Sequence, residues 1–197
     1  MPRMSDENTR LSTYTFYRLK KTPADVFGKH LARIRFIQEI QRDLNGARHA
    51  EQKIQFLNQS YILHLVAEWQ VFCEELVLHG FRALEVREST GVLHELAKAR
   101  MENALARFNT PNQKNIDQLF KETLNIPKIS QCWAWDTVTP QAAAETLNMI
   151  LKARHEIAHS GTTEEKLSYE KNYEYMETLV GIAQFTEDAM NKQLKIE

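Results

Sequence analysis

The residues that could do chemistry are concentrated in one short segment, 153–161, which reads Ala-Arg-His-Glu-Ile-Ala-His-Ser-Gly. Two different active sites can be read from it. His155-Glu156-x-x-His159 matches the pattern of zinc metallopeptidases, in which two imidazoles one helical turn apart bind the metal and a carboxylate activates water. Arg154-His155-x-x-x-His159 matches an arrangement in which an arginine and a histidine act on a phosphate group without metal.

The residues that follow the segment favour the arginine–histidine interpretation. Ser160-Gly161 comes directly after the second histidine, and glycine commonly marks a helix end, whereas a zinc peptidase keeps its histidines within a continuous helix. The extended zinc motif would have glycine and a third histidine where this chain has Thr162 and Glu165. Glu174 or Glu177 could still act as a distant third ligand, so a zinc hydrolase is the minor alternative. The primary prediction is a site with no metal and no cofactor.

Arg154 stands out because of its position in the predicted motif helix. The apolar positions of that helix are Ala143, Leu147, Ile150, Leu151, Ile157 and Ala158. Arg154 lies four residues after Ile150 and four before Ala158, and a guanidinium near an apolar face needs a partner. The partner is predicted to be an anionic ligand or Glu68, in the middle of the apolar second helix. An Arg154–Glu68 pair that only joins two helices is the purely structural interpretation.

The spacing of Arg154 and His159 bears on the oligomeric state. Five residues correspond to about 140° around an ideal helix, so the two side chains of one regular helix would not reach the same phosphate. They could meet if the helix loosens at Ser160-Gly161, or if two copies pack with their motif helices crossing. The spacing therefore makes a homodimer with a shared site plausible. His155 and His159 share a face at i and i+4, which keeps the zinc alternative open.

The elements that must position these residues are all predicted to be helices. Only six of the 197 residues are glycine, and alternating strand-like runs are nearly absent. Thr22-Pro23-Ala24-Asp25 predicts the start of a first helix that runs to about Leu44. A second, long helix is predicted over about 51–79, with Gly80 ending or bending it. Further helices are predicted at about 92–108, around 116–120, from Thr139-Pro140 into the motif, and at about 168–194, whereas 126–139 is too irregular to assign.

Length and composition predict one domain, 1–197, with a core at about 22–194 and an N-terminal extension at 1–21. The net charge is −1, but residues 1–53 hold eleven Lys/Arg against six Asp/Glu. That excess indicates either a phosphate-facing surface or solvated helix faces. The two distant cysteines, the absence of an apolar signal segment and the absence of a membrane span predict a soluble cytoplasmic protein.

Arg154-His155-x-x-Ala158-His159-Ser160-Gly161 at the end of a helix resembles the signature of the HEPN superfamily, an all-helical group found in prokaryotic toxins, defence systems and RNA-processing factors. The segment 65–72, Leu-Val-Ala-Glu-Trp-Gln-Val-Phe, resembles the second helix of its RiboL-PSP-HEPN type. So does the run from Asn109-Thr110-Pro111-Asn112 through Ile116, Asp117, Leu119, Phe120 and Trp133. The resemblance covers about 25–190. The commonest signature has Asn after the arginine, where this chain has His155.

The resemblance implies a HEPN-like helical bundle with a long second helix, a motif helix and a C-terminal helix. It also implies a metal-independent endoribonuclease that acts as a homodimer. Carried over, Arg154 would bind the scissile phosphate and His159 would be the general acid or base on the ribose 2′-OH or the leaving 5′-oxygen. His155 would orient the substrate, with Glu68 and Glu156 in support. RNA but not DNA would be cut, and an antitoxin or a defence-system protein is a possible partner. The alternative is a non-catalytic HEPN-like binding or assembly module.

Overall fold

The computed structural model describes residues 21–44, 46–85 and 91–196. In this part of the chain it shows six α-helices, one 3-10 helix and a single isolated bridge between Trp135 and Val138, so the all-α prediction is confirmed. Apart from Lys21, the predicted N-terminal extension lies outside the described residues. The helices are α1 (Pro23–Asp43), α2 (Ala50–Glu85), α3 (Val92–Arg107), α4 (Gln113–Leu124), the 3-10 helix η1 (Ile129–Cys132), α5 (Pro140–Ser160) and α6 (Tyr169–Leu194).

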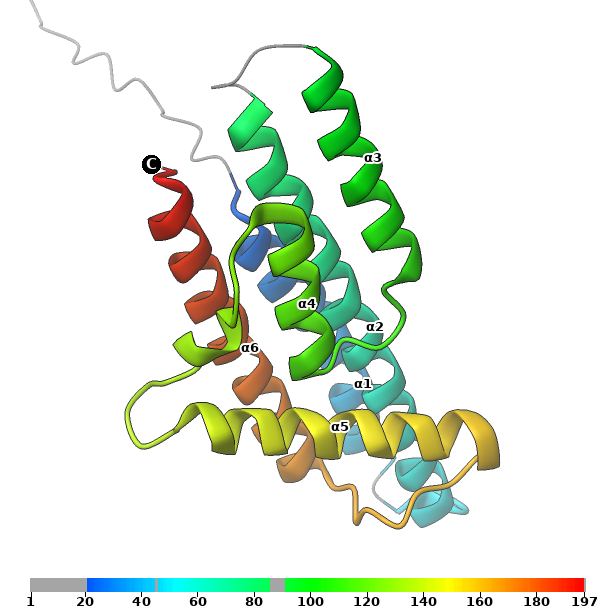
Figure 1. The fold of residues 1–197 in the computed structure, drawn as a ribbon. Coiled ribbons are helices and arrows are strands. Elements are labelled where there is room, and N and C mark those ends of the chain that lie inside the picture. The colour runs from blue at the N-terminus through cyan, green and yellow to red at the C-terminus, as the bar shows by residue number, and fades with distance from the viewer. Residues whose placement is uncertain (1–20, 45, 86–90, 197) are drawn as a thin grey trace, which may run out of the picture.

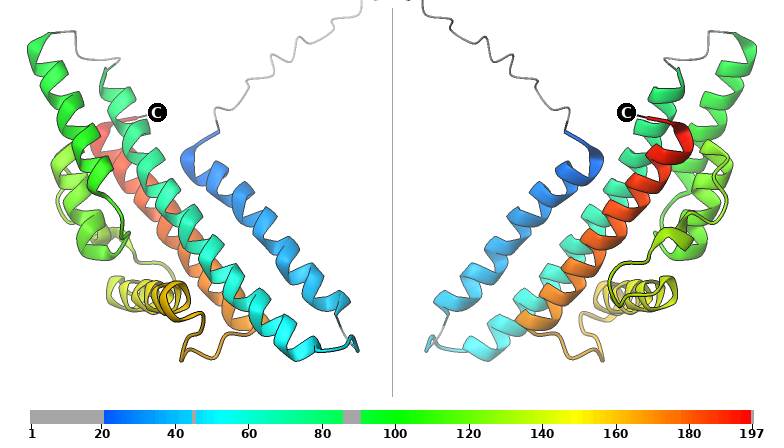
Figure 2. Two further views of the ribbon diagram at one scale, coloured as in Figure 1. Left: turned by 90° about the vertical axis from the view of Figure 1, so that its right-hand side faces the viewer. Right: turned by 90° about the vertical axis from the view of Figure 1, so that its left-hand side faces the viewer.

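The helices α1, α2 and α6 run alongside one another, and α5 lies across one end of them (Figure 1). Two views turned by 90° show α1 on one side of the α2–α6 pair and α3, α4 and α5 on the other (Figure 2). A polar contact inside the core joins the three long helices. Gln41 Nε2 of α1 and Asn172 Nδ2 of α6 both donate to Asn58 Oδ1 of α2, at 2.8 and 3.0 Å.

The first helix begins where the sequence predicts. Thr22 Oγ1 accepts from the Asp25 amide and Asp25 Oδ2 accepts from the Thr22 amide, each at 3.2 Å, which is a capping box. Pro23 takes the first helical position, where its missing amide hydrogen costs nothing. The helix ends at Asp43, one residue before the predicted end.

Gly80 does not end the second helix, contrary to one of the two sequence predictions for it, because α2 continues to Glu85. A Cβ at this position would lie 2.9 Å from Leu124 Cδ1 and from Met190 Sδ. Glycine is therefore favoured here by the close approach of side chains from α4 and α6, which would have to shift for a larger residue, and not by the backbone of a helix end. The helical spacing of Tyr61, Leu65 and Trp69 predicts a buried stripe on α2, and all three residues are buried.

The segment that the sequence left unassigned packs onto α6. Trp133 is fully buried, and its Nε1 donates to Thr186 Oγ1 at 2.9 Å. Trp135 stacks on Phe185 with ring centroids 5.5 Å apart and lies directly over Gly181. These contacts hold η1 and the start of α5 against the bundle.

The buried face of α6 matches the predicted stripe only in part. Helical spacing predicts a buried stripe of Tyr173, Met176, Val180, Ala183 and Met190. Met176, Ala183 and Met190 are buried, whereas Val180 is 38 % exposed, and Tyr175, Leu179 and Ile182 are buried in addition. Several apolar stripes are possible in a helix this rich in apolar residues, and the contacts with α1, α2 and α5 select one of them. No helix in the described part of the chain is long and apolar enough to cross a membrane.

Candidate active site at the end of α5

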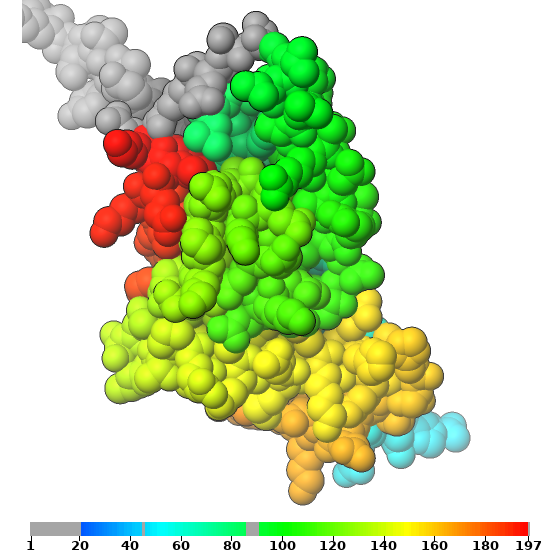
Figure 3. Space-filling model, viewed as in Figure 1, coloured from blue at the N-terminus to red at the C-terminus, as the bar shows by residue number. Residues whose placement is uncertain are grey.

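The helix α5 carries the whole motif and lies at the molecular surface along its length (Figure 3). Thr139 caps its start, because Thr139 Oγ1 accepts from the Ala142 amide at 3.2 Å. The helix stays regular through Ser160, and the amide of Gly161 donates to the Ile157 carbonyl at 2.9 Å. Gly161 has φ 74°, so the prediction that glycine ends this helix is confirmed. The helix therefore does not loosen between Arg154 and His159.

Arg154 does not lie on the buried face of α5, and this corrects the predicted stripe. The buried positions are Ala143, Ala144, Leu147, Ile150, Ala153 and Ile157. Ala153, one residue before the arginine, takes the core position and is 1 % exposed, whereas Arg154 and Ala158 are both exposed. The four-residue step from Ile150 to Arg154 suggested a position near the apolar face, but the helix turns about 100° per residue and the core follows the three-residue step to Ala153 instead.

The predicted Arg154–Glu68 ion pair is not formed. Glu68 Oε2 lies 2.7 Å from Nδ1 of His30 on α1, and α1 is on the other side of the bundle from α5. Arg154 makes no hydrogen bond or ion pair with any residue in 21–44, 46–85 or 91–196. The structure therefore separates Glu68 from the motif, and it leaves the guanidinium of Arg154 unpaired among the described residues.

His155 and His159 lie side by side on the outer face of α5. Their ring centroids are 4.3 Å apart with 53° between the ring planes, and both residues are exposed. Neither ring makes a hydrogen bond to a described residue. Their nitrogens are thus available to a ligand. Arg154 is about 100° from His155 and about 140° from His159 around the helix, so the motif forms a surface that curves around α5 and not one closed pocket.

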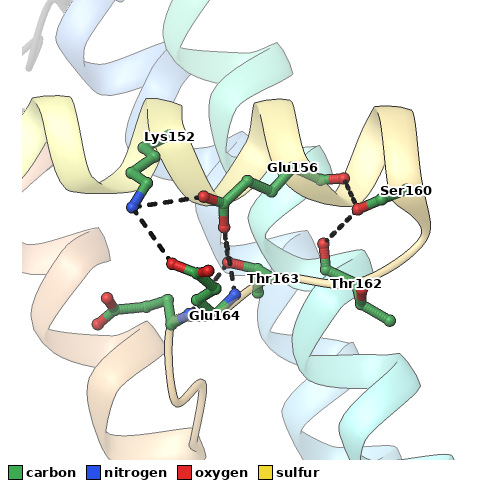
Figure 4. Close-up of polar contacts among 7 residues, drawn as sticks. Lys152, Glu156, Ser160, Thr162, Thr163 and Glu164 are labelled. Carbon is green, nitrogen blue, oxygen red and sulfur yellow. Dashed lines mark hydrogen bonds and ion pairs between the residues drawn. The ribbon is translucent and has the colours of Figure 1, made fainter.

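Glu156 faces the loop that joins α5 to α6 (Figure 4). Glu156 Oε2 accepts from Thr163 Oγ1 at 2.6 Å and from the Glu164 amide at 3.2 Å, and Glu156 Oε1 lies 3.4 Å from Lys152 Nζ. The hydrogen bond from Thr163 is the main cause that lowers the pKa of Glu156. Glu156 therefore anchors the segment that follows the motif, and its carboxylate is not free.

This arrangement bears on the zinc alternative. The general base of a zinc peptidase must be free to activate water, whereas the carboxylate of Glu156 already has three partners. Glu174, one of the possible third ligands, is paired with Lys171 at 3.4 Å. Across the ranges that the structure describes, no three His, Cys, Asp or Glu side chains are arranged to hold a metal ion. The two histidines alone offer half of the tetrahedral ligand set that zinc prefers.

Two contacts beside the motif were missed in the sequence. The Lys152–Glu156 pair could have been found from its i, i+4 spacing. The bond between Glu156 and Thr163 could not, because it depends on how the loop folds back. The partner of Glu68 was also beyond prediction, since His30 is 38 residues away.

Comparison with known protein families gives a match. The model of the family described as RiboL-PSP-HEPN matches residues 30–192, which include α2, the motif helix and most of α6. No curated protein and no solved structure matches the chain.

Proposed function

The chain belongs to the RiboL-PSP-HEPN family of the HEPN superfamily, and from this premise we propose that it is a metal-independent endoribonuclease. HEPN domains are commonly ribonucleases or nucleotide-binding domains. In this proposal the surface at the end of α5 binds RNA, and two copies of the chain supply one cleavage site. An antitoxin or a defence-system protein would be its natural regulator.

The exposed and unpaired guanidinium of Arg154 is the observation that carries the proposal. An arginine whose charge served the fold would be paired or hydrogen-bonded within the chain. Arg154 has no such partner among the described residues, while Lys152, two residues earlier, has two. Guanidinium groups bind phosphate oxygens through two parallel hydrogen bonds, which suits the charge that develops on a phosphate during cleavage.

The neighbouring imidazoles supply the proton transfers that RNA cleavage needs. His159 would take the proton from the ribose 2′-OH, or give one to the leaving 5′-oxygen, because histidine titrates near neutral pH. The 2′-oxygen then forms a bond to phosphorus as the bond to the 5′-oxygen breaks, which leaves a 2′,3′-cyclic phosphate and a 5′-hydroxyl. His155, whose ring contacts that of His159, would orient the substrate.

A second copy is needed because α5 is regular through Ser160. Arg154 and His159 of one copy face directions about 140° apart. If two α5 helices cross, Arg154 of one copy can lie opposite His159 of the other. The proposal therefore includes a homodimer with the ends of α5 at or beside its interface.

Cleavage of a single-stranded RNA by the purified chain tests the proposal. We expect cleavage in excess EDTA, no zinc in the purified protein, and no cleavage when the nucleotide at the cut site is 2′-deoxy. Arg154→Ala and His159→Ala should each slow cleavage by about 10²–10⁴-fold. Arg100→Ala, an exposed arginine on α3, should not.

Other outcomes would lead to different functions. RNA that is bound but left whole by the wild-type chain would identify a binding or assembly module. Hydrolysis of a peptide that stops in EDTA and is lost in both His155→Ala and His159→Ala would identify a zinc hydrolase.

A further inference from the structure

A cleft of about 300 Å³ lies between α1 and α2, on the side of the bundle away from the motif helix. Its middle is apolar, with Phe27 and Phe72 as the floor and Val26 and Val71 on the walls. The two valines are 36 % and 44 % exposed. Water-exposed apolar side chains that line a cavity of this size are typical of a site that receives an apolar ligand.

The two ends of the cleft differ in chemistry. The helices α1 and α2 are antiparallel neighbours, so Lys21 at the start of α1 lies toward His79 and Arg82 near the end of α2. At the other end His30 Nδ1 and Glu68 Oε2 are 2.7 Å apart. The cleft thus has a cationic end, an apolar middle, and an end with a polar pair that can exchange hydrogen bonds.

The cationic end has no counter-ion within the described chain. Neither Lys21 nor Arg82 makes an ion pair in the ranges that the structure describes. Desolvation and the nearby ammonium of Lys21 lower the pKa of Lys29, which is exposed outside the cleft, whereas Asp25 acts in the opposite direction. Lys21 and Arg82 thus bring two positive charges without ion-pair partners among the described residues to one end of the cleft, and this favours an anion there. Glu75, which lines the cleft between Phe72 and His79 along α2, would repel an anion placed beside it and so favours a position nearer Arg82.

We propose that this cleft binds an organic anion with an elongated apolar body, such as an aryl or medium-length acyl carboxylate. Its carboxylate would lie between Lys21 and Arg82, and its ring or chain on Phe27 and Phe72. A polar group at its far end would meet the His30–Glu68 pair. Phe72 and Arg82 are ten residues apart on α2, about 15 Å along the axis. The long side chains of Lys21 and Arg82 shorten this span to the length of such a molecule.

The composition of the middle decides between this ligand and a more polar one of the same charge. Apart from Glu75, no hydrogen-bonding side chain lines that part of the cleft. A sugar would lose its bonds to water there without replacing them, whereas an aryl or acyl body would not.

Binding of octanoate and of indole-3-butyrate to the full chain tests the proposal, with octan-1-ol and AMP as comparison probes. The measurement is calorimetric titration in an Arg154→Ala/His159→Ala background, so that the result is independent of the proposed ribonuclease site. We expect at least one carboxylate to bind saturably in the micromolar range. Octan-1-ol and AMP should bind at least about ten-fold more weakly, because octan-1-ol lacks the carboxylate and AMP lacks the apolar body. The relative affinities of octanoate and indole-3-butyrate distinguish a chain from a ring.

Two substitutions locate the site. Arg82→Glu reverses the charge at the cationic end, and Val71→Asp places a carboxylate in the apolar middle. Each should weaken binding about ten-fold or more. The matched control is Val180→Asp, because Val180 has a similar exposure, 38 %, on α6 and does not line this cleft.

Three results would overturn the proposal. The first is no saturable binding of either carboxylate at 1 mM, on the order of the weakest small-ligand affinities. The second is binding that neither Arg82→Glu nor Val71→Asp changes. The third is a dimer that Val71→Asp, but not Val180→Asp, converts to monomer, because the cleft would then be a contact between copies.

Discussion

If Arg154 and His159 act from different copies, two inactive variants should restore activity when they are mixed. Arg154→Ala and His159→Ala each destroy both sites of their own homodimer. In a mixed dimer, one site receives both substituted residues and the other receives both native ones. The regular course of α5 to Ser160 is the reason to expect this pairing, because it separates the two side chains within one chain.

The size of the recovery follows from symmetry. A one-to-one mixture that exchanges freely contains about half mixed dimers, and each of these has one intact site of two, so about a quarter of the wild-type rate should return. The separate variants should keep about 1 % of that rate or less. The recovery would therefore exceed the background by about 25-fold or more.

Co-expression of differently tagged variants, followed by purification through both tags, gives the mixed dimer directly. Its cleavage rate should be about half that of wild type, and a mixed dimer of two Arg154→Ala chains with the same tags should stay inactive. An isolated mixed dimer of Arg154→Ala and His159→Ala with no activity would refute the shared-site reasoning. Arg154 and His159 would then have to act within one chain, or a single site would need both residues from both copies.

Two further predictions concern stability. Arg154→Ala should change the free energy of unfolding by no more than about 0.5 kcal/mol, because the side chain is exposed and unpaired. Ala153→Arg places a charge at a position that is 1 % exposed and should cost about 3 kcal/mol or more, seen as a fall of roughly 10 °C in Tm. If Arg154→Ala instead destabilised the protein more than Ala153→Arg, Arg154 and not Ala153 would lie on the core face. Because the folded pKa of Glu156 is lowered, mainly by Thr163, its contribution is present above the ordinary glutamate pKa of about 4.3 and is lost as the pH falls through the lowered value. Glu156→Gln should reduce the fall in the free energy of unfolding at low pH, measured by urea titration at several pH values, whereas Glu102→Gln on exposed α3 should not. An equal fall in the wild type and both variants would show that the contacts of Glu156 contribute nothing to stability.

Signals carried by neighbouring residues were readable in the sequence. Thr22 and Thr139 cap their helices as predicted because a cap joins residues three apart and needs nothing else from the fold. Gly161 ends α5 for the same reason. The family of the chain also followed from the motif and its upstream context, since these are patterns of residue type.

Signals that depend on two helices were not readable. The sequence predicted that Gly80 ends or bends the second helix, and its contact with side chains of α4 and α6 follows only from the positions of those helices. Glu68 could pair with an arginine or a histidine, and the packing of α1 beside α2 gives it His30.

The sequence by itself thus determined which groups are present, where the helices start, and that an arginine and two histidines lie at the end of one of them. Only the tertiary structure decided that Ala153 faces the core and Arg154 faces outward. The physical reason is that an apolar pattern defines a helix face only to within about one residue, or 100° of rotation, and the remaining choice is made by the helices against which it packs.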